Sequence, residues 1–392
     1  MKLSISNEEI HERQEKFKLQ MHDNGIDGVI LFSSADIFYL TNFHFISTER
    51  PTSFFVDLKG KTHLLVPQLD DGYAKEHACV DEIHYYHEFP DLCHPMEEFK
   101  KLLVKYGFIG KTIGFDSDGY SSPYGYRGPR LSEIIDANFK SVFPWVEEMR
   151  YVKSPTEIEL IKESCRWGNL AHRLLQKYSK AGFSEVEIAS RASYEATLIM
   201  VDTLGNGYRP YGNTAFATFR GQVGKLSAYP HIVTQNVKLN KGDNLVTGAA
   251  ADVWRYCSEL ERTMFVEEVS PEQEKFFHHM YEAQEVAFSN IKPGQPTSIV
   301  DKEVQKYIDE NGLREYVPHH TGHAIGLMMH EAPFFDLGDN SIMEPGMVFT
   351  VEPGIFVKGL GGFRHSDTVL VTEDGMEMLT YYPRDLESMI CY

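Results

Sequence analysis

Helical and strand-like patterns of apolar residues alternate over the first 150 positions of the chain. Residues 8–24 place apolar side chains at helical spacing, and Gly25 follows as a C-cap. A second helix is predicted over residues 96–106. Short runs rich in β-branched and aromatic residues predict strands at GVILF, SFFVDL, HLLVP and KTIGFD, with LKGK as a hairpin turn between the second and third. Strands separated by helices predict an α/β domain over residues 1–150.

A different pattern begins at about residue 151, where helix starts alternate with strand-like runs. Ser154-Pro155-Thr156-Glu157 combines a capping box with proline at the first helical position. Further helices are predicted to begin at Ser184, at Ser270 and at Ser298, the last one ending at Asn311-Gly312. The runs between them are NLVTGAA, ERTMFVEEV, MVFTVEPGIFV and DTVLVTEDG. Helix pairs separated by strand runs predict an α+β domain over residues 151–392.

Charge and cysteine content narrow the classes of function. The 392 residues carry a formal net charge of −19, which disfavours nucleic-acid partners and serves solubility. We expect no membrane partner, since no apolar stretch is long enough to span a bilayer and the N-terminus lacks a signal-type apolar segment. The 5 cysteines are scattered and form no CxxC pair, which favours reduced thiols and a cytoplasmic location.

Histidine and glutamate gather in four segments of the second half. They are His231 in SAYPHIV, Glu259 and Glu261 in CSELERT, His323 and His330 in HHTGHAIGLMMHEAP, and Glu352 in FTVEPGIF, which GGFRHSD with Arg364 follows. In a strand, Glu259 and Glu261 would point to the same face. Carboxylates in such apolar contexts are costly unless they meet a cation, a donor or a substrate. The alternative to a catalytic role is a structural ion pair with Arg262 or Arg364.

These motifs, in this order over about 150 residues, resemble those of the pita-bread superfamily of creatinase, prolidase and aminopeptidase P. The boundary segment KSPTEIELIK is also typical of that superfamily. The resemblance implies a C-terminal pita-bread domain over residues 151–392, with an antiparallel sheet and flanking helices. It also implies a smaller creatinase-type α/β domain over residues 1–150, and a homodimer in which N-terminal domains complete neighbouring sites.

The metallopeptidases of this superfamily hold two divalent ions with two aspartates, one histidine and two glutamates. The matching positions of this chain are Gly248, Glu259, His323, Glu352 and Ser366. Two carboxylates are therefore replaced by groups that bind divalent ions poorly or not at all, and we expect no dinuclear site and no cofactor. The alternative is one ion (Mn, Co, Zn or Fe) held by Glu259, His323 and Glu352.

In lacking these two carboxylates the chain resembles creatinase, a metal-free member of the superfamily. Creatinase cleaves a C–N bond in a guanidino substrate with a histidine and two glutamates. His231, Glu261 and Glu352 stand at the matching positions, where most metallopeptidases have a threonine or similar residue in place of Glu261. Paired carboxylates bind a planar guanidinium, and a histidine can act first as base and then as acid. The predicted catalytic residues are His231, Glu261, Glu352, His323 and His330. The predicted substrate-binding residues are Arg50, Phe45 and Arg364.

Three functions remain open from the sequence. The first is metal-independent hydrolysis of a C–N bond in a small amidino, amide or cyclic-amidine substrate. The second is a metal-dependent Xaa-Pro dipeptidase with a modified metal site, because His330-Glu331-Ala332-Pro333 is peptidase-like. The third is a non-catalytic binding protein on the same scaffold, since fold alone does not establish an enzyme. The expected partner is a small molecule or a dipeptide.

Overall fold

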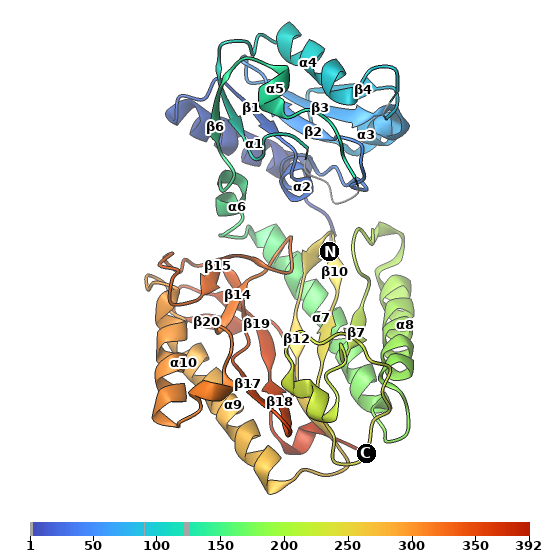
Figure 1. The fold of residues 1–392 in the computed structure, drawn as a ribbon, viewed down its shortest axis with the longest axis vertical. Helices are drawn as coiled ribbons and strands as arrows, with labels where there is room; N and C mark the ends of the chain where they lie inside the picture. The colour runs from blue at the N-terminus through green and yellow to red at the C-terminus, as the bar shows by residue number, and fades with distance from the viewer. Residues whose placement is uncertain (1–2, 90, 121–124) are drawn as a thin grey trace. The chain divides into compact units, whose positions relative to one another are not determined.

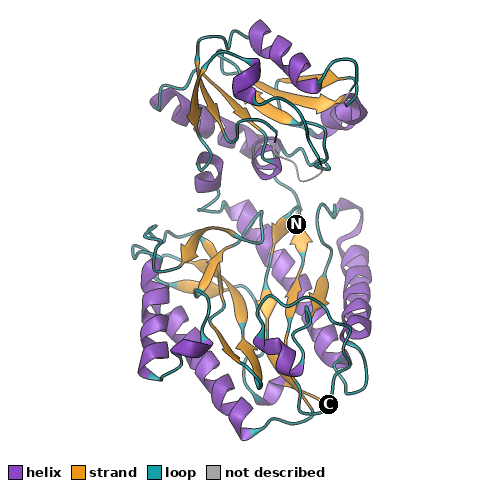
Figure 2. Cartoon of the chain, in the orientation of Figure 1, coloured by secondary structure: helices purple, strands orange, loops and turns teal. Residues whose placement is uncertain are grey.

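The computed structural model describes residues 3–89, 91–120 and 125–392, and the chain separates into two compact units (Figures 1 and 2). The smaller unit is Ile5–Met149, and the larger one contains Arg150–Tyr392. None of the helices described in these ranges is long and apolar enough to cross a membrane. All five cysteines are free thiols.

The N-terminal unit is built on one mixed sheet with strand order β4-β3-β2-β1-β5-β6. Only the pairs β1–β2 and β2–β3 are antiparallel. The strands are β1 (Gly28–Leu31), β2 (Ser53–Val56), β3 (Thr62–Pro67), β4 (Glu82–Tyr86), β5 (Thr112–Phe115) and β6 (Asn138–Ser141). The helices are α1 (Asn7–Asp23), α2 (Ser34–Thr41), α3 (Asp71–His77), α4 (Pro95–Lys105), α5 (Leu131–Ile134) and α6 (Trp145–Met149). The predicted α/β class of this part is confirmed.

Aromatic packing on one face of this sheet explains where α4 lies. Phe55 of β2 is fully buried against Phe99 of α4 and against Phe108, which follows the helix. His94 caps α4 by accepting from the amide of Met96, and Pro95 occupies the first turn, where its missing N–H costs nothing.

Four long helices flank the strands of the C-terminal unit (Figure 1). They are α7 (Pro155–Tyr178), α8 (Glu185–Leu204), α9 (Pro271–Asn290) and α10 (Ser298–Glu310), which pack as the pairs α7–α8 and α9–α10. Ser154 and Ser270 form complete capping boxes, whereas Ser184 caps α8 by accepting from the amide of Glu187. Serine caps followed by proline or acidic residues therefore set three of the four helix starts.

An antiparallel sheet of eight strands forms the centre of the unit, in the order β15-β14-β16-β19-β12-β9-β7 with β20 beside β19. Its strands are β7 (Phe216–Thr218), β9 (Gly248–Ala250), β12 (Leu260–Glu261), β14 (Gly322–Ala324), β15 (Glu331–Phe335), β16 (Val348–Val351), β19 (Ser366–Val371) and β20 (Met376–Met378). Smaller sheets join β8 (Asn244–Val246), β13 (Thr263–Val266) and β21 (Ile390–Cys391); β10 (Asp252–Val253) and β11 (Tyr256–Cys257); and β17 (Gly354–Val357) and β18 (Gly361–Arg364). The predicted α+β pita-bread architecture is confirmed.

Candidate active site

A pocket of about 480 Å³ collects most of the predicted catalytic residues where β12, β16 and β18 end. The side chains that line it are Arg220, Pro230, His231, Glu259, Glu261, Pro318, His319, His320, His330, Glu352 and Arg364. The central sheet therefore brings the four segments predicted from the sequence to one place.

Strand geometry puts two glutamates side by side in this pocket. Glu259 and Glu261 flank Leu260, and because strand side chains alternate, both carboxylates line the pocket while Leu260 is buried in the core. The pairing of β12 with β19 sets Glu261 opposite Ser366. Both glutamates are more than nine-tenths buried, at 8% and 3% exposed.

Arg364, the last residue of β18, holds the carboxylate of Glu261 with two nitrogens. Its Nη2 donates to Oε1 over 2.7 Å, and its Nε lies 2.5 Å from Oε2. Arg220 adds a second guanidinium, whose Nη2 donates to the same Oε1 over 2.9 Å. Burial alone would lower the pKa of Arg364, but the carboxylates of Glu261 and Glu352 outweigh it and raise that pKa. The counter-charges of Glu261 thus belong to the chain itself.

His323 and Glu352 form a second buried ion pair. Nδ1 of His323 lies 2.9 Å from the carbonyl of Ala324, so Nδ1 carries a proton, and Nε2 lies 3.1 Å from Oε1 of Glu352. Burial would lower the pKa of His323, yet the bond to Glu352 and the charge of Glu259 raise it. Burial would raise the pKa of Glu352, yet His323 and Arg364 bring it below the ordinary value. His330 stacks on His323, with ring centroids 3.7 Å apart.

Glu259 has the least counter-charge of the three glutamates. It accepts a hydrogen bond from Oγ of Ser366 over 2.8 Å. Burial raises the pKa of this carboxyl above its usual range, and the charges of Glu352 and Glu261 act in the same direction. A carboxyl group of this kind exchanges a proton closer to neutral pH than Glu352 does.

The donor set does not fit a pair of divalent ions. Gly248 offers no side-chain donor, and the hydroxyl of Ser366 already donates to Glu259. Of the remaining donors, Glu352 and His323 face each other as an ion pair. Two sets of three side chains lie close enough for a single ion, namely Glu259, His323 and His330, and Glu259, Glu261 and Glu352.

The predicted substrate-binding residues fall in different places. Arg364 lines the pocket, but its guanidinium is engaged by Glu261. Arg50 belongs to the N-terminal unit, where it is paired with Glu49 and with Glu88. Phe45 is buried in the same unit and stacks on Phe43 with ring centroids 5.8 Å apart. The roles of Arg50 and Phe45 towards a substrate stay predictions.

Three polar residues of the pocket were not among the predicted site residues: Arg220, His319 and His320. Arg220 sits in the loop after β7 with a φ of 51°, a left-handed backbone that nothing in the local sequence predicts. His319 and His320 are separated from the glycine-flanked His323 only by Thr321 and Gly322, and their closeness to it in the sequence was the signal that could have found them. Burial, and then the charge of Arg364, keep the pKa of His319 below its ordinary value.

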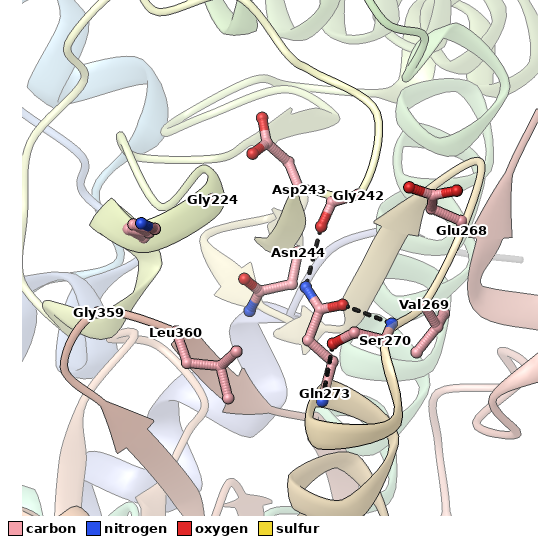
Figure 3. A pocket seen from close by; sticks show the side chains of 11 residues that line it. Gly224, Gly242, Asp243, Asn244, Glu268, Val269, Ser270, Gln273, Gly359 and Leu360 are labelled. Atoms are coloured by element: carbon pink, nitrogen blue, oxygen red, sulfur yellow. Dashed lines mark hydrogen bonds between the residues drawn. The ribbon is translucent and has the colours of Figure 1, made fainter.

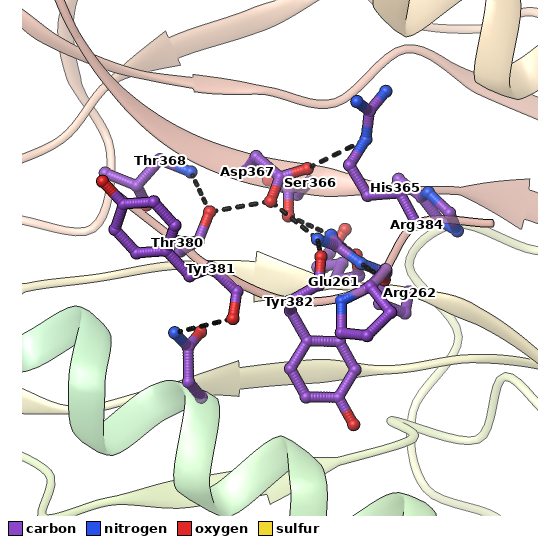
Figure 4. Close-up of polar contacts among 12 residues, drawn as sticks. Glu261, Arg262, His365, Ser366, Asp367, Thr368, Thr380, Tyr381, Tyr382 and Arg384 are labelled. Carbon is purple, nitrogen blue, oxygen red and sulfur yellow. Dashed lines mark hydrogen bonds and ion pairs between the residues drawn. The ribbon is translucent and has the colours of Figure 1, made fainter. Parts of the chain in front are cut away.

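A buried network behind the pocket fixes the strands that carry Glu261 and Ser366 (Figure 4). Arg262 is fully buried, and its Nη1 donates to the carbonyls of Glu261 and Ser366 over 2.7 and 3.0 Å. Its Nη2 donates to Oδ1 of Asp367 over 2.8 Å, and Thr380 donates to the same oxygen over 2.7 Å. Arg262 therefore positions the site from behind and does not enter it.

A second pocket, of about 320 Å³, lies at the start of α9 (Figure 3). Gln273 accepts from the amide of Ser270 and donates to the carbonyl of Gly242. These bonds cap the helix and join it to the neighbouring turn, so its glutamine and serine have structural partners. We assign no chemistry to this pocket.

Comparison with known proteins agrees with the fold. Residues 13–152 match the creatinase/prolidase N-terminal domain, and residues 159–373 match metallopeptidase family M24. The chain is 28% identical over 379 residues to an Xaa-Pro dipeptidase of Pyrococcus horikoshii, covering 96% of this chain and 99% of that protein. It is similar to the crystal structure of the prolidase from Pyrococcus horikoshii OT3, with a TM-score of 0.79, 28% identity and 96% and 99% coverage. It is also similar to a prolidase from Thermococcus sibiricus, with a TM-score of 0.84, 26% identity and 99% coverage of both chains.

The M24 match spans more than half of the chain and contains every glutamate and histidine of the pocket described above. The relatives named Xaa-Pro dipeptidases are hydrolases of C–N bonds, and the predicted superfamily and enzyme class are confirmed. The chain belongs to metallopeptidase family M24, with a creatinase/prolidase N-terminal domain.

Proposed function

We propose that this chain hydrolyses a C–N bond of a small amidino, amide or cyclic-amidine substrate without a pair of metal ions. One observation carries the proposal: the counter-charges of Glu261 and Glu352 are Arg364, Arg220 and His323 of the same chain. Gly248 and Ser366 also stand where the resemblance places two further donors of a dinuclear centre. Two divalent ions would add four positive charges to a pocket in which Glu261 and Glu352 already have counter-charges.

The chemistry assigned to the pocket is proton transfer to and from a bound water. In this scheme the carboxylate of Glu259 takes a proton from the water, and the water oxygen attacks the electrophilic carbon of the substrate. The C–N bond then breaks as the leaving nitrogen takes this proton from the Glu259 carboxyl, directly or through His231, and Glu259 returns to the carboxylate. The raised pKa of Glu259 suits a group that must both accept and release a proton. The products are the hydrolysed carbonyl compound and a free amine.

This assignment differs from the sequence-based one, which gave the carboxylate roles to Glu261 and Glu352. Both of those glutamates are held in ion pairs, so their positions suit orientation and charge balance better than proton exchange. His231 lines the pocket and is exposed, which leaves it free to approach a substrate. Arg220 also lines the pocket, and 41% of its side chain is exposed, so we assign it the recognition of an anionic group on the substrate.

The test is a turnover screen of purified, chelator-treated protein on small amidines, cyclic amidines and amides. We expect activity that survives chelator and falls by about 10²–10⁴ in Glu259→Gln. Exposed Glu310→Gln, at the end of α10, is the matched control and should leave turnover unchanged. Activity that vanishes with chelator and returns with manganese or cobalt would overturn the proposal.

The second candidate function is a metal-dependent Xaa-Pro dipeptidase. It is favoured by the similarity to an Xaa-Pro dipeptidase and a prolidase, and by the His323–His330 stack. In that case one ion would be held by Glu259, His323 and His330, whose donor atoms lie close together, or by the set predicted from the sequence, which has Glu352 in place of His330. Hydrolysis of Xaa-Pro dipeptides by protein that retains one ion in elemental analysis would establish this function in place of the first.

The homodimer predicted from the resemblance belongs to the same proposal. If Arg50 and Phe45 of a neighbouring subunit complete the pocket, Arg50→Ala should raise KM with little change in kcat. Light scattering at micromolar concentration measures the assembly directly. A monomer with full activity would remove both residues from the site.

A further inference from the structure

Three metal-ligand side chains meet at the edge of the N-terminal sheet, within the unit Ile5–Met149. Glu82 and His84 lie on the edge strand β4, and His63 lies on its parallel neighbour β3. Residues two apart on a strand share a face, which is why Glu82 and His84 point the same way. None of these residues was singled out by the sequence motifs, because His63 and His84 are 21 positions apart.

The three donor atoms are spaced as the ligands of one ion are. Nδ1 of His63 lies 3.1 Å from Nε2 of His84, and Oε2 of Glu82 lies 3.9 Å from each of these nitrogens. A point equidistant from the three atoms is about 2.1 Å from each, which is the length of a zinc–nitrogen or zinc–oxygen bond. Two imidazoles and one carboxylate are a common ligand set for late first-row divalent ions.

The protonation of the three groups suits a cation. Burial lowers the pKa of His63, and burial and the proximity of His63 lower that of His84 to about 4. Both rings are therefore neutral at pH 7, with a lone pair available for a metal. Hydrogen bonds from Tyr106 and Lys61 lower the pKa of Glu82 to about 2, so it is a carboxylate.

The groups behind the donors match those found behind metal-bound histidines. Oδ2 of Asp57 lies 3.4 Å from Nε2 of His63, the ring nitrogen that faces away from the cluster. A carboxylate in this place orients the imidazole and makes its other nitrogen a better ligand. The hydroxyl of Tyr106 donates to Oε2 of Glu82 over 2.7 Å and holds that carboxylate in position.

Access is from the edge of the sheet. The side chain of His63 is fully buried, whereas those of His84 and Glu82 are 15% and 35% exposed. Lys61, half exposed, reaches Oε1 of Glu82 over 3.0 Å and is the cation that competes for this carboxylate. The alternative to a metal site is a hydrogen-bonded histidine pair packed between Phe55 and Tyr106.

We propose that His63, Glu82 and His84 form a binding site for one late first-row divalent cation, with Zn²⁺ as the reference ion. The ion would join the edge strand β4 to β3, and its stabilising effect would grow with the concentration of free metal. The site is separate from the pocket of the C-terminal unit and does not depend on the proposed function.

The test is equilibrium dialysis of the full chain against zinc chloride alone, after chelator treatment, with metal measured per chain. The wild type and His323→Asn should each retain one zinc ion per chain at this site, because His323 lies in the other unit. His84→Gln should lose it while keeping its circular dichroism spectrum. If His84→Gln fails to fold, Glu82→Gln takes its place, since that side chain is more exposed.

A charge-removing variant separates the metal site from a structural histidine pair. Lys61→Met removes the competing ammonium and should tighten zinc binding about tenfold, whereas exposed Lys59→Met should not. Equal zinc stoichiometry in wild type and His84→Gln, loss of all zinc in His323→Asn, or no zinc bound at micromolar concentration would each overturn the proposal.

Discussion

The guanidinium of Arg364 holds Glu261 with Nη2 at 2.7 Å and Nε at 2.5 Å, deep in the candidate active site. Both residues are at least nineteen-twentieths buried, so neither charge is well screened by water. Removing one partner of such a pair leaves the other charge without compensation. The charge balance of the pocket therefore depends on the guanidinium of Arg364.

Arg364→Lys should therefore be damaging although it keeps the charge. A lysine ammonium cannot contact both carboxylate oxygens in the planar manner of a guanidinium. We expect a loss of stability of about 3 kcal/mol and a fall in kcat/KM of more than tenfold, measured by thermal unfolding and turnover. Arg314→Lys is the matched control, because Arg314 also contacts Asp309 through two nitrogens but at the surface. Equal effects of the two variants would contradict a role for burial.

Restoring the missing carboxylates should restore metal binding. A Cβ at Gly248 would meet nothing closer than 3.7 Å, and the backbone there is not left-handed, so an aspartate fits. The double variant Gly248→Asp/Ser366→Glu should retain more manganese per chain than the wild type in elemental analysis. Gly72→Asp, at an open surface position, should retain no more than the wild type. An unchanged metal content in the double variant would mean that the two substitutions do not explain the departure from the family pattern.

Local sequence patterns predicted the elements, and some pairings needed the structure. The serine caps at Ser154 and Ser270 were predictable because capping is decided within four residues. The sequence offered Arg262 or Arg364 as ion-pair partners of the glutamates and could not choose between them. In the structure Arg262 follows Glu261 directly and so points to the opposite face, where it meets Asp367, while Arg364 reaches Glu261.

Local sequence patterns could not predict the conformations of the loops that complete the pocket. Arg220 reaches Glu261 only because a left-handed residue turns the chain after β7. The three atoms at His63, Glu82 and His84 meet only through the register of two parallel strands. Contacts of this kind depend on tertiary pairing, and no spacing along the chain encodes them.

The hydroxyl of Ser366 should tune the pH dependence of the proposed reaction. Its hydrogen bond favours the ionised form of Glu259 and so lowers that pKa, against the larger effect of burial. In Ser366→Ala the pKa of Glu259 should rise further. The limb on which kcat/KM rises with pH should then move upward by about one unit. Thr368→Val is the control, since Thr368 donates to the backbone carbonyl of Glu259 and not to its carboxylate. A downward or absent shift in Ser366→Ala would show that Glu259 is not the titrating base.

His172 should make the fold sensitive to acid. Oγ1 of Thr247 donates its one proton to the carbonyl of Arg262, so it accepts from Nε2 of His172 over 2.7 Å. Nδ1 of this fully buried ring then carries no proton and has no hydrogen-bond partner among the described residues. Burial, and then the charge of Arg262, lower the pKa of His172 to about 3. A proton added to Nδ1 would place an uncompensated charge in the core.

The sign of the pH effect follows from the two states of His172. The unfolded chain binds the proton below its ordinary pKa of about 6.5, and the folded chain binds it only near pH 3. Between these values the unfolded state holds more protons, so the free energy of unfolding falls as pH falls. The slope from this one group approaches about 1.4 kcal/mol per pH unit, and above pH 7 the group contributes no pH dependence.

Denaturant unfolding at several pH values from 7 to 4 measures this slope. His172→Gln keeps an N–H donor for Thr247 but cannot titrate, so its stability should fall less steeply than that of the wild type. The difference between the two slopes isolates His172 from other buried histidines such as His365, whose pKa is also lowered by burial. His22→Gln, at a side chain that is 88% exposed, should leave the slope unchanged. If His172→Gln and the wild type lose stability in parallel, the buried ring is already protonated in the folded state or shares its proton with a group that compensates for it.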